Sequence, residues 1–328
     1  SPRASNAASS GWLTENFMAV SGSGGSASIV EPGSPQGLEC APMRSPFVLA
    51  QYLMPKQAMT RFAGRVAGAG AGLLTRMLIR GFIARYGVDM AEAEHADPAA
   101  YPTFNAFFTR ALRPGIRPIA ATGLVCPVDG AISQFGRIQG DQIFQAKGHA
   151  YSTLALVGGD PALAAQFTDG DFATIYLSPR DYHRINMPAA ARLPRMIHVP
   201  GELFSVNPQT AAGVPGLFAR NERVVCVFDT ARGPFVLVLV GATIVGSMAT
   251  TWHGVVNPPR TGDVREWHYN RATDTPVTLQ QGDEMGRFLL GSTVVLLFPQ
   301  GPLQFNPAWV PGRAVRLGEV MAQRAIAS

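Results

Sequence analysis

Apolar residues in the second half of the chain fall into short runs that are rich in β-branched side chains. The clearest runs span residues 173–177, 224–228, 235–240, 242–248 and 288–298. Glycine, proline, asparagine and aspartate gather between the runs and mark turns. Because no long helical pattern alternates with these runs, the sequence predicts an antiparallel β-rich domain, either a sandwich or a barrel.

From residue 43 to residue 86, apolar side chains instead recur three or four positions apart, as in amphipathic helices. Pro55 separates a short helix (47–54) from a longer one, which the glycines of residues 68–72 loosen. Thr103 is placed to cap a further short helix at its N-terminus. The predicted fold class is therefore α+β, with N-terminal amphipathic helices preceding the β-rich domain.

Composition divides the chain into three segments. Residues 1–42 are rich in Ser, Gly, Ala and Pro without a period, which predicts a disordered leader derived from an expression vector, before a native start at Met43. Residues 43–100 form a basic, amphipathic helical region. Residues 101–328 form the β-rich domain that carries the candidate chemistry.

The helical region is basic as far as residue 88. No acidic residue occurs between Glu39 and Asp89, whereas seven Lys or Arg residues do, and the whole chain carries a net charge of +5. Such helices suit an anionic membrane surface, where each basic side chain contributes about 1 kcal/mol. The alternative is an ordinary solvated surface helix, and nucleic acid is disfavoured because no binding motif is present. The candidate membrane residues are Arg61, Arg65, Arg76 and Arg80.

Three polar clusters interrupt the apolar pattern. They contain Asp129 before a glycine, His183 in a polar loop, and Ser292 in the break Gly291-Ser292-Thr293. The break is either a bulge in one core strand or a serine held against its own preceding carbonyl. Asp, His and Ser together also allow a serine hydrolase, although the G-x-S-x-G elbow is missing. No metal site is predicted, because paired Cys or His spacing is lacking.

Seven segments, in order, make the chain from about Met43 resemble the phosphatidylserine decarboxylases. They are 104–110 (FNAFFTR), 127–130 (PVDG), 147–152 (KGHAYS), 182–184 (YHR), 198–207 (HVPGELFSVN), 217–223 (LFARNER) and 290–293 (LGST). The resemblance implies a proenzyme that cuts itself between Gly291 and Ser292. Ser292 then becomes a covalent pyruvoyl group, which serves as an electron sink while carbon dioxide leaves phosphatidylserine.

The resemblance also implies roles for individual residues. Asp129 matches the aspartate that works with a histidine to activate the serine, and His183 matches the histidine that serves decarboxylation. Three further residues are expected to bind substrate, namely Lys147, His149 and Tyr151. The implied partners are phosphatidylserine and an anionic membrane surface, with no nucleic acid and no metal. The implied assembly is a homodimer, peripheral on the cytoplasmic face of a bacterial inner membrane.

Asn186 departs from the family pattern Y-H-R-x-H-x-P, because it replaces the processing histidine. Asparagine accepts no proton near neutral pH, so we expect slow or absent self-cleavage. We interpret the change as an engineered substitution, with natural divergence as the alternative. Three other functions stay open: a decarboxylase of another serine-headed lipid, a serine hydrolase using Asp129, His183 and Ser292, and a lipid-binding module without catalysis.

Overall fold

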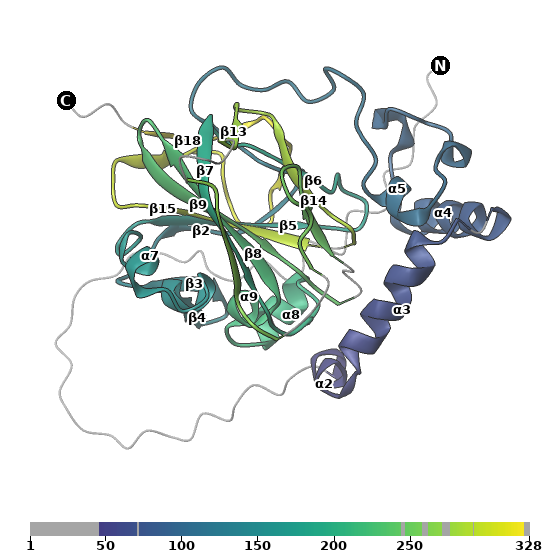
Figure 1. Ribbon diagram of the computed structural model, residues 1–328, viewed down its shortest axis with the longest axis horizontal. Helices are drawn as coiled ribbons and strands as arrows, with labels where there is room; N and C mark the ends of the chain where they lie inside the picture. The colour runs from purple at the N-terminus through teal and green to yellow at the C-terminus, as the bar shows by residue number, and fades with distance from the viewer. Residues whose placement is uncertain are drawn as a thin grey trace, which may run out of the picture.

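The computed structural model describes residues 46–70, 72–243, 247–257, 262–270, 276–290 and 292–324 (Figure 1). The predicted leader, residues 1–42, lies outside the described residues, and so does Gly291. Ser292 is described as a strand residue only.

The described residues include a sheet of nine strands whose pairings are all antiparallel. Its central strands are mostly apolar because both faces of the sheet are covered. Its order is β12 (Arg265–His268), β7 (Ala191–Val199), β8 (Arg223–Thr230), β9 (Gly233–Val240), β15 (Ser292–Phe298), β5 (Asp171–Leu177), β2 (Gly130–Arg137) and β17 (Ala314–Val315), with β13 (Thr278–Leu279) beside β7.

Two smaller sheets cover one face of this large sheet. The first has the order β1 (Leu124–Val125), β18 (Val320–Arg324) and β16 (Leu303–Phe305). The second has the order β11 (Gly254–Val255), β10 (Met248–Thr250), β14 (Glu284–Phe288) and β6 (Arg184–Asn186). In β15, Val294 and Leu296 contribute to the core on this face, and Val295 and Leu297 to the core on the other.

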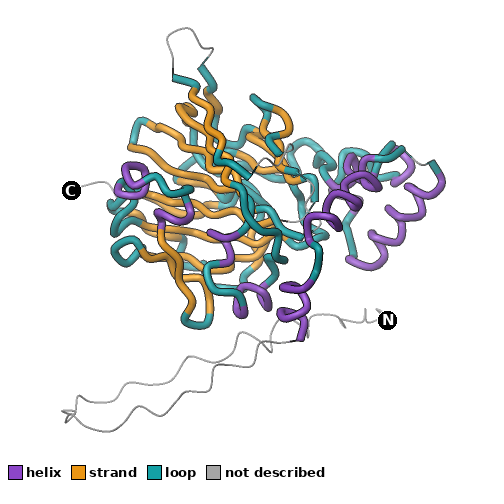
Figure 2. The backbone as a smooth tube through the Cα atoms, turned by 60° about the horizontal axis from the view of Figure 1, so that its bottom comes forward, coloured by secondary structure: helices purple, strands orange, loops and turns teal. Residues whose placement is uncertain are grey.

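Short elements cover the opposite face (Figure 2). They are the hairpin β3 (Gln142–Ala146) and β4 (His149–Ser152), with helices α6 (Thr153–Leu156), α7 (Pro161–Ala165), α8 (Pro208–Gly213) and α9 (Leu217–Arg220). The predicted α+β class with an antiparallel, sandwich-like domain is therefore confirmed.

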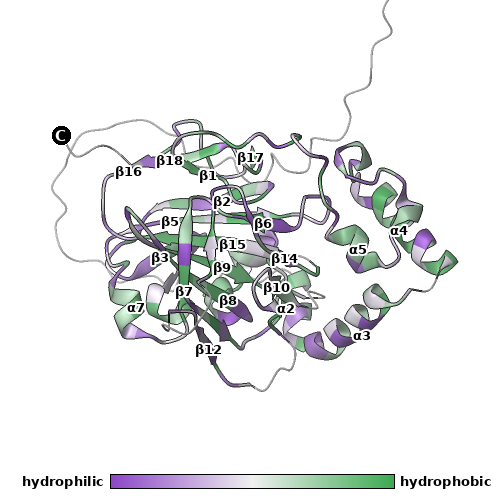
Figure 3. Cartoon of the chain, turned by 45° about the horizontal axis from the view of Figure 1, so that its top comes forward, coloured by the Kyte–Doolittle hydropathy of each residue, from purple (hydrophilic) through white to green (hydrophobic). Residues whose placement is uncertain are grey.

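The predicted N-terminal helices are present as α2 (Pro46–Leu53), α3 (Lys56–Gly68), α4 (Leu73–Tyr86) and α5 (Phe104–Phe108), with short 3-10 turns at Met90–Glu92 and Pro98–Ala100. The side chain of Thr103 caps α5, as predicted. α2 packs on the sandwich through Val48 and Gln51, whereas α3 and α4 lie beside it (Figures 1 and 3). No single described helix is long and apolar enough to cross a membrane; α3 and α4 reach that length and composition only together, and they are bent by 112°.

Two predicted strands need correction. The run 288–298 is not one bulged strand, because β14 pairs with β6 and β10 whereas β15 pairs with β5 and β9. Both halves are apolar because each is buried in its own sheet, and β14 ends at Phe288 whereas β15 begins at Ser292. The predicted strand 242–248 is also wrong at its start, since Ala242 and Thr243 are outside any strand and β10 begins at Met248.

Candidate active site

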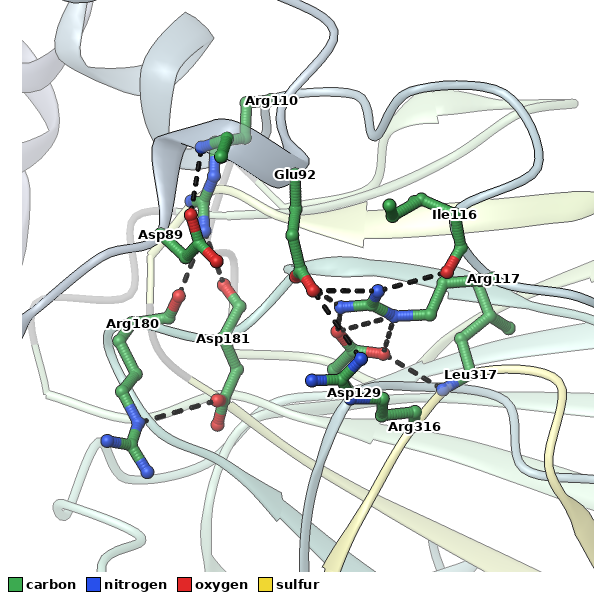
Figure 4. A network of polar contacts seen from close by, with 11 residues as sticks. Asp89, Glu92, Arg110, Ile116, Arg117, Asp129, Arg180, Asp181, Arg316 and Leu317 are labelled. Atoms are coloured by element: carbon green, nitrogen blue, oxygen red, sulfur yellow. Dashed lines mark hydrogen bonds and ion pairs between the residues drawn. The ribbon is translucent and has the colours of Figure 1, made fainter. Parts of the chain in front are cut away.

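Asp129 lies immediately before β2 and is held by a buried arginine (Figure 4). Arg117 Nε donates to Asp129 Oδ1 over 3.0 Å and its Nη2 donates to Oδ2 over 2.6 Å. The main-chain N–H of Leu317 donates to Oδ1 over 2.9 Å. The same guanidinium reaches Glu92 Oε2 over 2.6 Å, and this hydrogen bond lowers the pKa of Glu92. Asp129 is thus a fixed carboxylate with both oxygens engaged.

The register of the large sheet brings Asp129 and Ser292 to one edge. Tyr176 of β5 pairs with Ala131 of β2 on one side and with Thr293 of β15 on the other. Since both outer strands run antiparallel to β5, they are parallel to each other and begin at the same end. Their starts hold Asp129 and Ser292, two strand spacings apart, which is roughly 10 Å.

His183 lies in the loop between β5 and β6, and its side chain is fully buried. Neither ring nitrogen has a hydrogen-bond partner among the described residues. Burial and then the positive charge of Arg110 lower the pKa of His183 to about 3, so the ring is neutral at pH 7. Its carbonyl accepts from the N–H of Phe288 over 3.0 Å, four residues before Ser292. His183 is therefore tied to the segment that leads to the predicted cleavage position.

Asn186 is buried at the end of β6, beside the segment that leads to Asp129. Its main-chain N–H donates to the carbonyl of Pro127 over 2.8 Å, and its Nδ2 donates to the carbonyl of Gly282 over 2.8 Å. Its Oδ1 has no partner in the part of the chain that the structure describes. Asn186 is thus bonded to Pro127, which lies two residues before Asp129. Its side chain cannot accept a proton near neutral pH.

A cleft of about 280 Å³ opens at this edge, and Asp129, Gly130 and Tyr182 are among its lining residues. Arg110, Arg180 and Arg316 supply positive charge to its wall. Sequence reasoning did not single out Arg117 or Glu92, because no motif or periodic pattern marks them. Within the described residues, no group of three or more His, Cys, Asp or Glu side chains is placed to hold a metal ion.

A sequence model of the phosphatidylserine decarboxylase family matches residues 104–323, and a second model, described as PSD, matches residues 46–87. The phosphatidylserine decarboxylase proenzyme of Variovorax paradoxus (strain S110) is 71% identical over 85% of this chain and 97% of that protein. Those of Polaromonas sp. (strain JS666 / ATCC BAA-500) and Polaromonas naphthalenivorans (strain CJ2) are 70% and 72% identical, over 85% and 84% of this chain and 98% and 95% of the relatives. This chain belongs to the phosphatidylserine decarboxylase family.

Membership of the phosphatidylserine decarboxylase family confirms the predicted resemblance and the predicted enzyme class, a carboxy-lyase. The family uses a pyruvoyl group. The site fits such a group, because the His183 ring has two unpaired nitrogens and its carbonyl accepts from Phe288, four residues before Ser292. The serine hydrolase alternative is not favoured: Arg117 engages Asp129, and among the described residues no carboxylate contacts the His183 ring.

The three predicted substrate-binding residues belong to another part of the phosphatidylserine decarboxylase fold. Lys147 is in the turn of the β3–β4 hairpin, with φ 45°, and His149 begins β4. Tyr151 is buried in the core on the helix-covered face, edge-on to Phe218. None of the three lines the cleft beside Asp129. Their role in substrate binding stays a prediction.

Proposed function

We propose that this chain is the proenzyme of a bacterial phosphatidylserine decarboxylase, which converts phosphatidylserine to phosphatidylethanolamine and carbon dioxide at a membrane surface. The observation that carries the proposal is the convergence of three matched segments at one edge of the large sheet. Asp129 and the start of β15 at Ser292 lie at the same end of the two strands that flank β5, and His183, in the loop that follows β5, is bonded to Phe288, four residues before Ser292.

In this proposal Ser292 Oγ attacks the carbonyl carbon of Gly291, which exchanges the amide bond for an ester and releases the Ser292 nitrogen as an amine. β-Elimination then breaks the ester, which leaves a carboxylate on residue 291 and a dehydroalanine at position 292. Water hydrolyses the imine tautomer of that dehydroalanine, which releases ammonia and leaves a pyruvoyl group. That group supplies the electron sink for decarboxylation. His183 holds, on an unpaired ring nitrogen, the proton that the substrate carbon receives after carbon dioxide has left.

Asn186 makes self-cleavage slow in this proposal. The serine hydroxyl needs a proton acceptor, and the asparagine amide provides none near neutral pH. Asp129 cannot easily replace it, because both of its oxygens are engaged by Arg117 and Leu317. Loss of a positioned base typically slows a reaction by about 10²–10⁴-fold. The chain is therefore proposed to persist with residues 291 and 292 still joined.

The membrane part of the proposal rests on α3 and α4. Phe62 and Leu73 are 70% and 71% exposed, and Val66, Leu74, Met77 and Leu78 are exposed beside them. Among these apolar side chains are four exposed arginines, namely Arg61, Arg65, Arg76 and Arg80. Such a surface suits anionic lipid, which includes the substrate itself. The proposed location is the cytoplasmic face of the bacterial inner membrane, and the proposed assembly is a homodimer.

The intact mass of the denatured protein, compared with that of an Asn186→His variant, tests this proposal. We expect one full-length species here and two species in the variant, the smaller with a blocked first residue at position 292. Cleavage already present here would contradict the role of Asn186. If neither protein is cut, the pyruvoyl mechanism itself is wrong and a non-catalytic lipid-binding module takes its place. Lipid extracts are then incubated with the cut variant. The decarboxylated product that forms shows whether phosphatidylserine or another serine-headed lipid is the substrate.

A further inference from the structure

The C-terminal end of α5 is joined to the loop that carries His183 by two reciprocal arginine contacts. Arg110 Nη2 donates to the carbonyl of Arg180 over 2.9 Å and lies 3.5 Å from that of Asp181 (Figure 4). In return, Arg184 Nε donates to the carbonyl of Thr109 over 2.8 Å. Arg110 therefore fixes this loop, but these contacts use only one of its three nitrogens.

The other two nitrogens of Arg110 are unused. Nε and Nη1 are buried and have no hydrogen-bond partner among the described residues, and the whole residue is only 4% exposed. No carboxylate of the described chain forms an ion pair with it. Glu92 and Asp129 are taken by Arg117, and Asp181 accepts from the N–H of Ser178 over 2.7 Å.

A buried guanidinium without an anionic partner is costly, because its hydration is lost and the ring of Phe107, whose centroid is 5.6 Å from Arg110 Cζ, offsets only part of that loss. Burial accordingly lowers the pKa of Arg110. The loop contacts alone do not require this charge, since a neutral donor is able to bind two carbonyls. Arg110 instead lines the wall of the cleft, and the N–H donors that the loop does not use are suited to an anionic oxygen. The free donors thus indicate a ligand rather than a structural role only.

We propose that the Arg110 guanidinium, in the wall of the cleft beside Asp129, binds the phosphodiester of the substrate headgroup. This inference rests on the proposed function for the identity of the headgroup. The headgroup has two anions, the phosphodiester and the carboxylate. A guanidinium on the carboxylate stabilises the charge that decarboxylation must remove, and so favours the ground state over the transition state. The phosphodiester keeps its charge throughout and is the better partner.

Binding of a phosphodiester at Arg110 also affects His183. The charge of Arg110 is one of the two causes, after burial, that lower the pKa of His183. A bound anion offsets that charge and makes protonation of the ring less unfavourable. The same contact therefore anchors the headgroup and prepares the neighbouring proton donor.

Direct binding to the uncleaved chain tests the proposal without any turnover. The probes are glycerophosphoserine, glycerophosphoethanolamine, which lacks the carboxylate, and free serine, which lacks the phosphodiester. Their Kd values are measured by NMR titration for the chain and for Arg110→Gln, Arg110→Lys and Arg180→Gln. Arg180 lines the same cleft but is exposed, so Arg180→Gln is the matched control. Thermal melting checks that each variant is folded.

We expect Arg110→Gln to weaken both phosphodiester probes by at least about tenfold, Arg110→Lys to retain part of the affinity, and Arg180→Gln to have little effect. Free serine is expected to bind weakly and independently of Arg110. If Arg110→Gln is folded and binds the phosphodiester probes with unchanged affinity, the proposal is overturned and Arg110 has only a structural role. If only the carboxylate-bearing probes depend on Arg110, the assignment to the phosphodiester is wrong. Because no step requires cleavage, failure of self-processing does not influence the result.

Discussion

The ring of Phe108 lies edge-on against the ring of His183, with the ring centroids 4.0 Å apart and the planes at 89°. Phe108 belongs to a core cluster that also contains Ile79 of α4 and Leu290, two residues before Ser292. The proposed proton donor is thus sealed by α5, and α5 shares one core with the proposed membrane helices and with the segment before the cleavage position. In the uncleaved chain, access to His183 requires this cluster to move.

The buried state of His183 predicts an acid-sensitive fold. Burial lowers its pKa to about 3, whereas an unfolded histidine titrates near 6.5. Between these two values the unfolded chain binds a proton that the folded chain does not. This residue therefore lowers the free energy of unfolding as pH falls, by up to about 1.4 kcal/mol per pH unit. Urea unfolding measures this between pH 6.5 and pH 4. The free energy of unfolding should fall more steeply with pH in the unchanged chain than in His183→Gln, and equal slopes would contradict the prediction.

Arg117 is predicted to be a major contributor to stability. Its side chain is only 6% exposed and it neutralises two carboxylates, those of Glu92 and Asp129. Its removal in Arg117→Gln leaves both without their cation, which typically costs about 3–5 kcal/mol for a buried pair. The exposed pair of Arg192 with Asp229 is the control, because Arg192→Gln should cost about 0–1 kcal/mol. Urea unfolding of both variants measures the difference, and equal losses would refute the prediction.

The sheet was largely predictable because β5, β8 and β9 are continuous apolar runs bounded by turn residues. The run 288–298 was misread because apolar character records burial and not which sheet a strand joins. The Arg117 contacts were out of reach for a different reason. Its partners lie 25 residues before it, in a 3-10 turn, and 12 after it, just before β2, and no periodic pattern connects them.

The candidate site was likewise predictable from the sequence only in part. Asp129, His183 and Ser292 were found because each stands out as a polar residue in apolar surroundings, and a family motif surrounds each one. Arg110 also lay within a matched segment, but only the three-dimensional structure shows that two of its nitrogens lack partners. Whether a donor has a partner depends on its neighbours in space. The carbonyls that Arg110 contacts belong to residues 70 and 71 positions away in the sequence.

Replacement of Gly130, the residue after Asp129, is predicted to destabilise the fold. A Cβ at this position would lie 2.4 Å from the carbonyl oxygen of Tyr176, within the central pairing of β2 and β5. Because the obstructing atom belongs to the main chain, the strands must separate, and Gly130→Ala should cost about 1–3 kcal/mol. Gly301→Ala is the control, since its nearest atom would be 3.8 Å away. Thermal melting that ranks the two variants equally would show that the sheet tolerates the shift.

The surface of α3 and α4 predicts two separable contributions to membrane binding. Leu73 and Leu74 are exposed apolar side chains, and replacing both with serine removes area that enters the lipid. Replacing Arg76 and Arg80 with glutamine removes only charge, at about 1 kcal/mol for each arginine near an anionic surface. In sedimentation with vesicles, the serine pair should weaken binding to anionic and neutral lipid alike. The glutamine pair should weaken binding to anionic vesicles alone, and high salt should abolish that difference.

A charge change on the sandwich controls for the overall charge of the protein. Arg192→Gln removes one positive charge from β7, in the sandwich and not in α3 or α4, and should leave vesicle binding within about twofold of the unchanged chain. If Arg192→Gln weakens binding as much as Arg76→Gln alone, a single variant that is measured beside the pair, attraction arises from net charge and not from the helices. If the serine pair binds vesicles like the unchanged chain, the exposed leucines face something other than lipid. Exposed apolar side chains such as these leucines often mark a protein contact. In that case, sedimentation without vesicles would measure whether a second copy of the chain binds there.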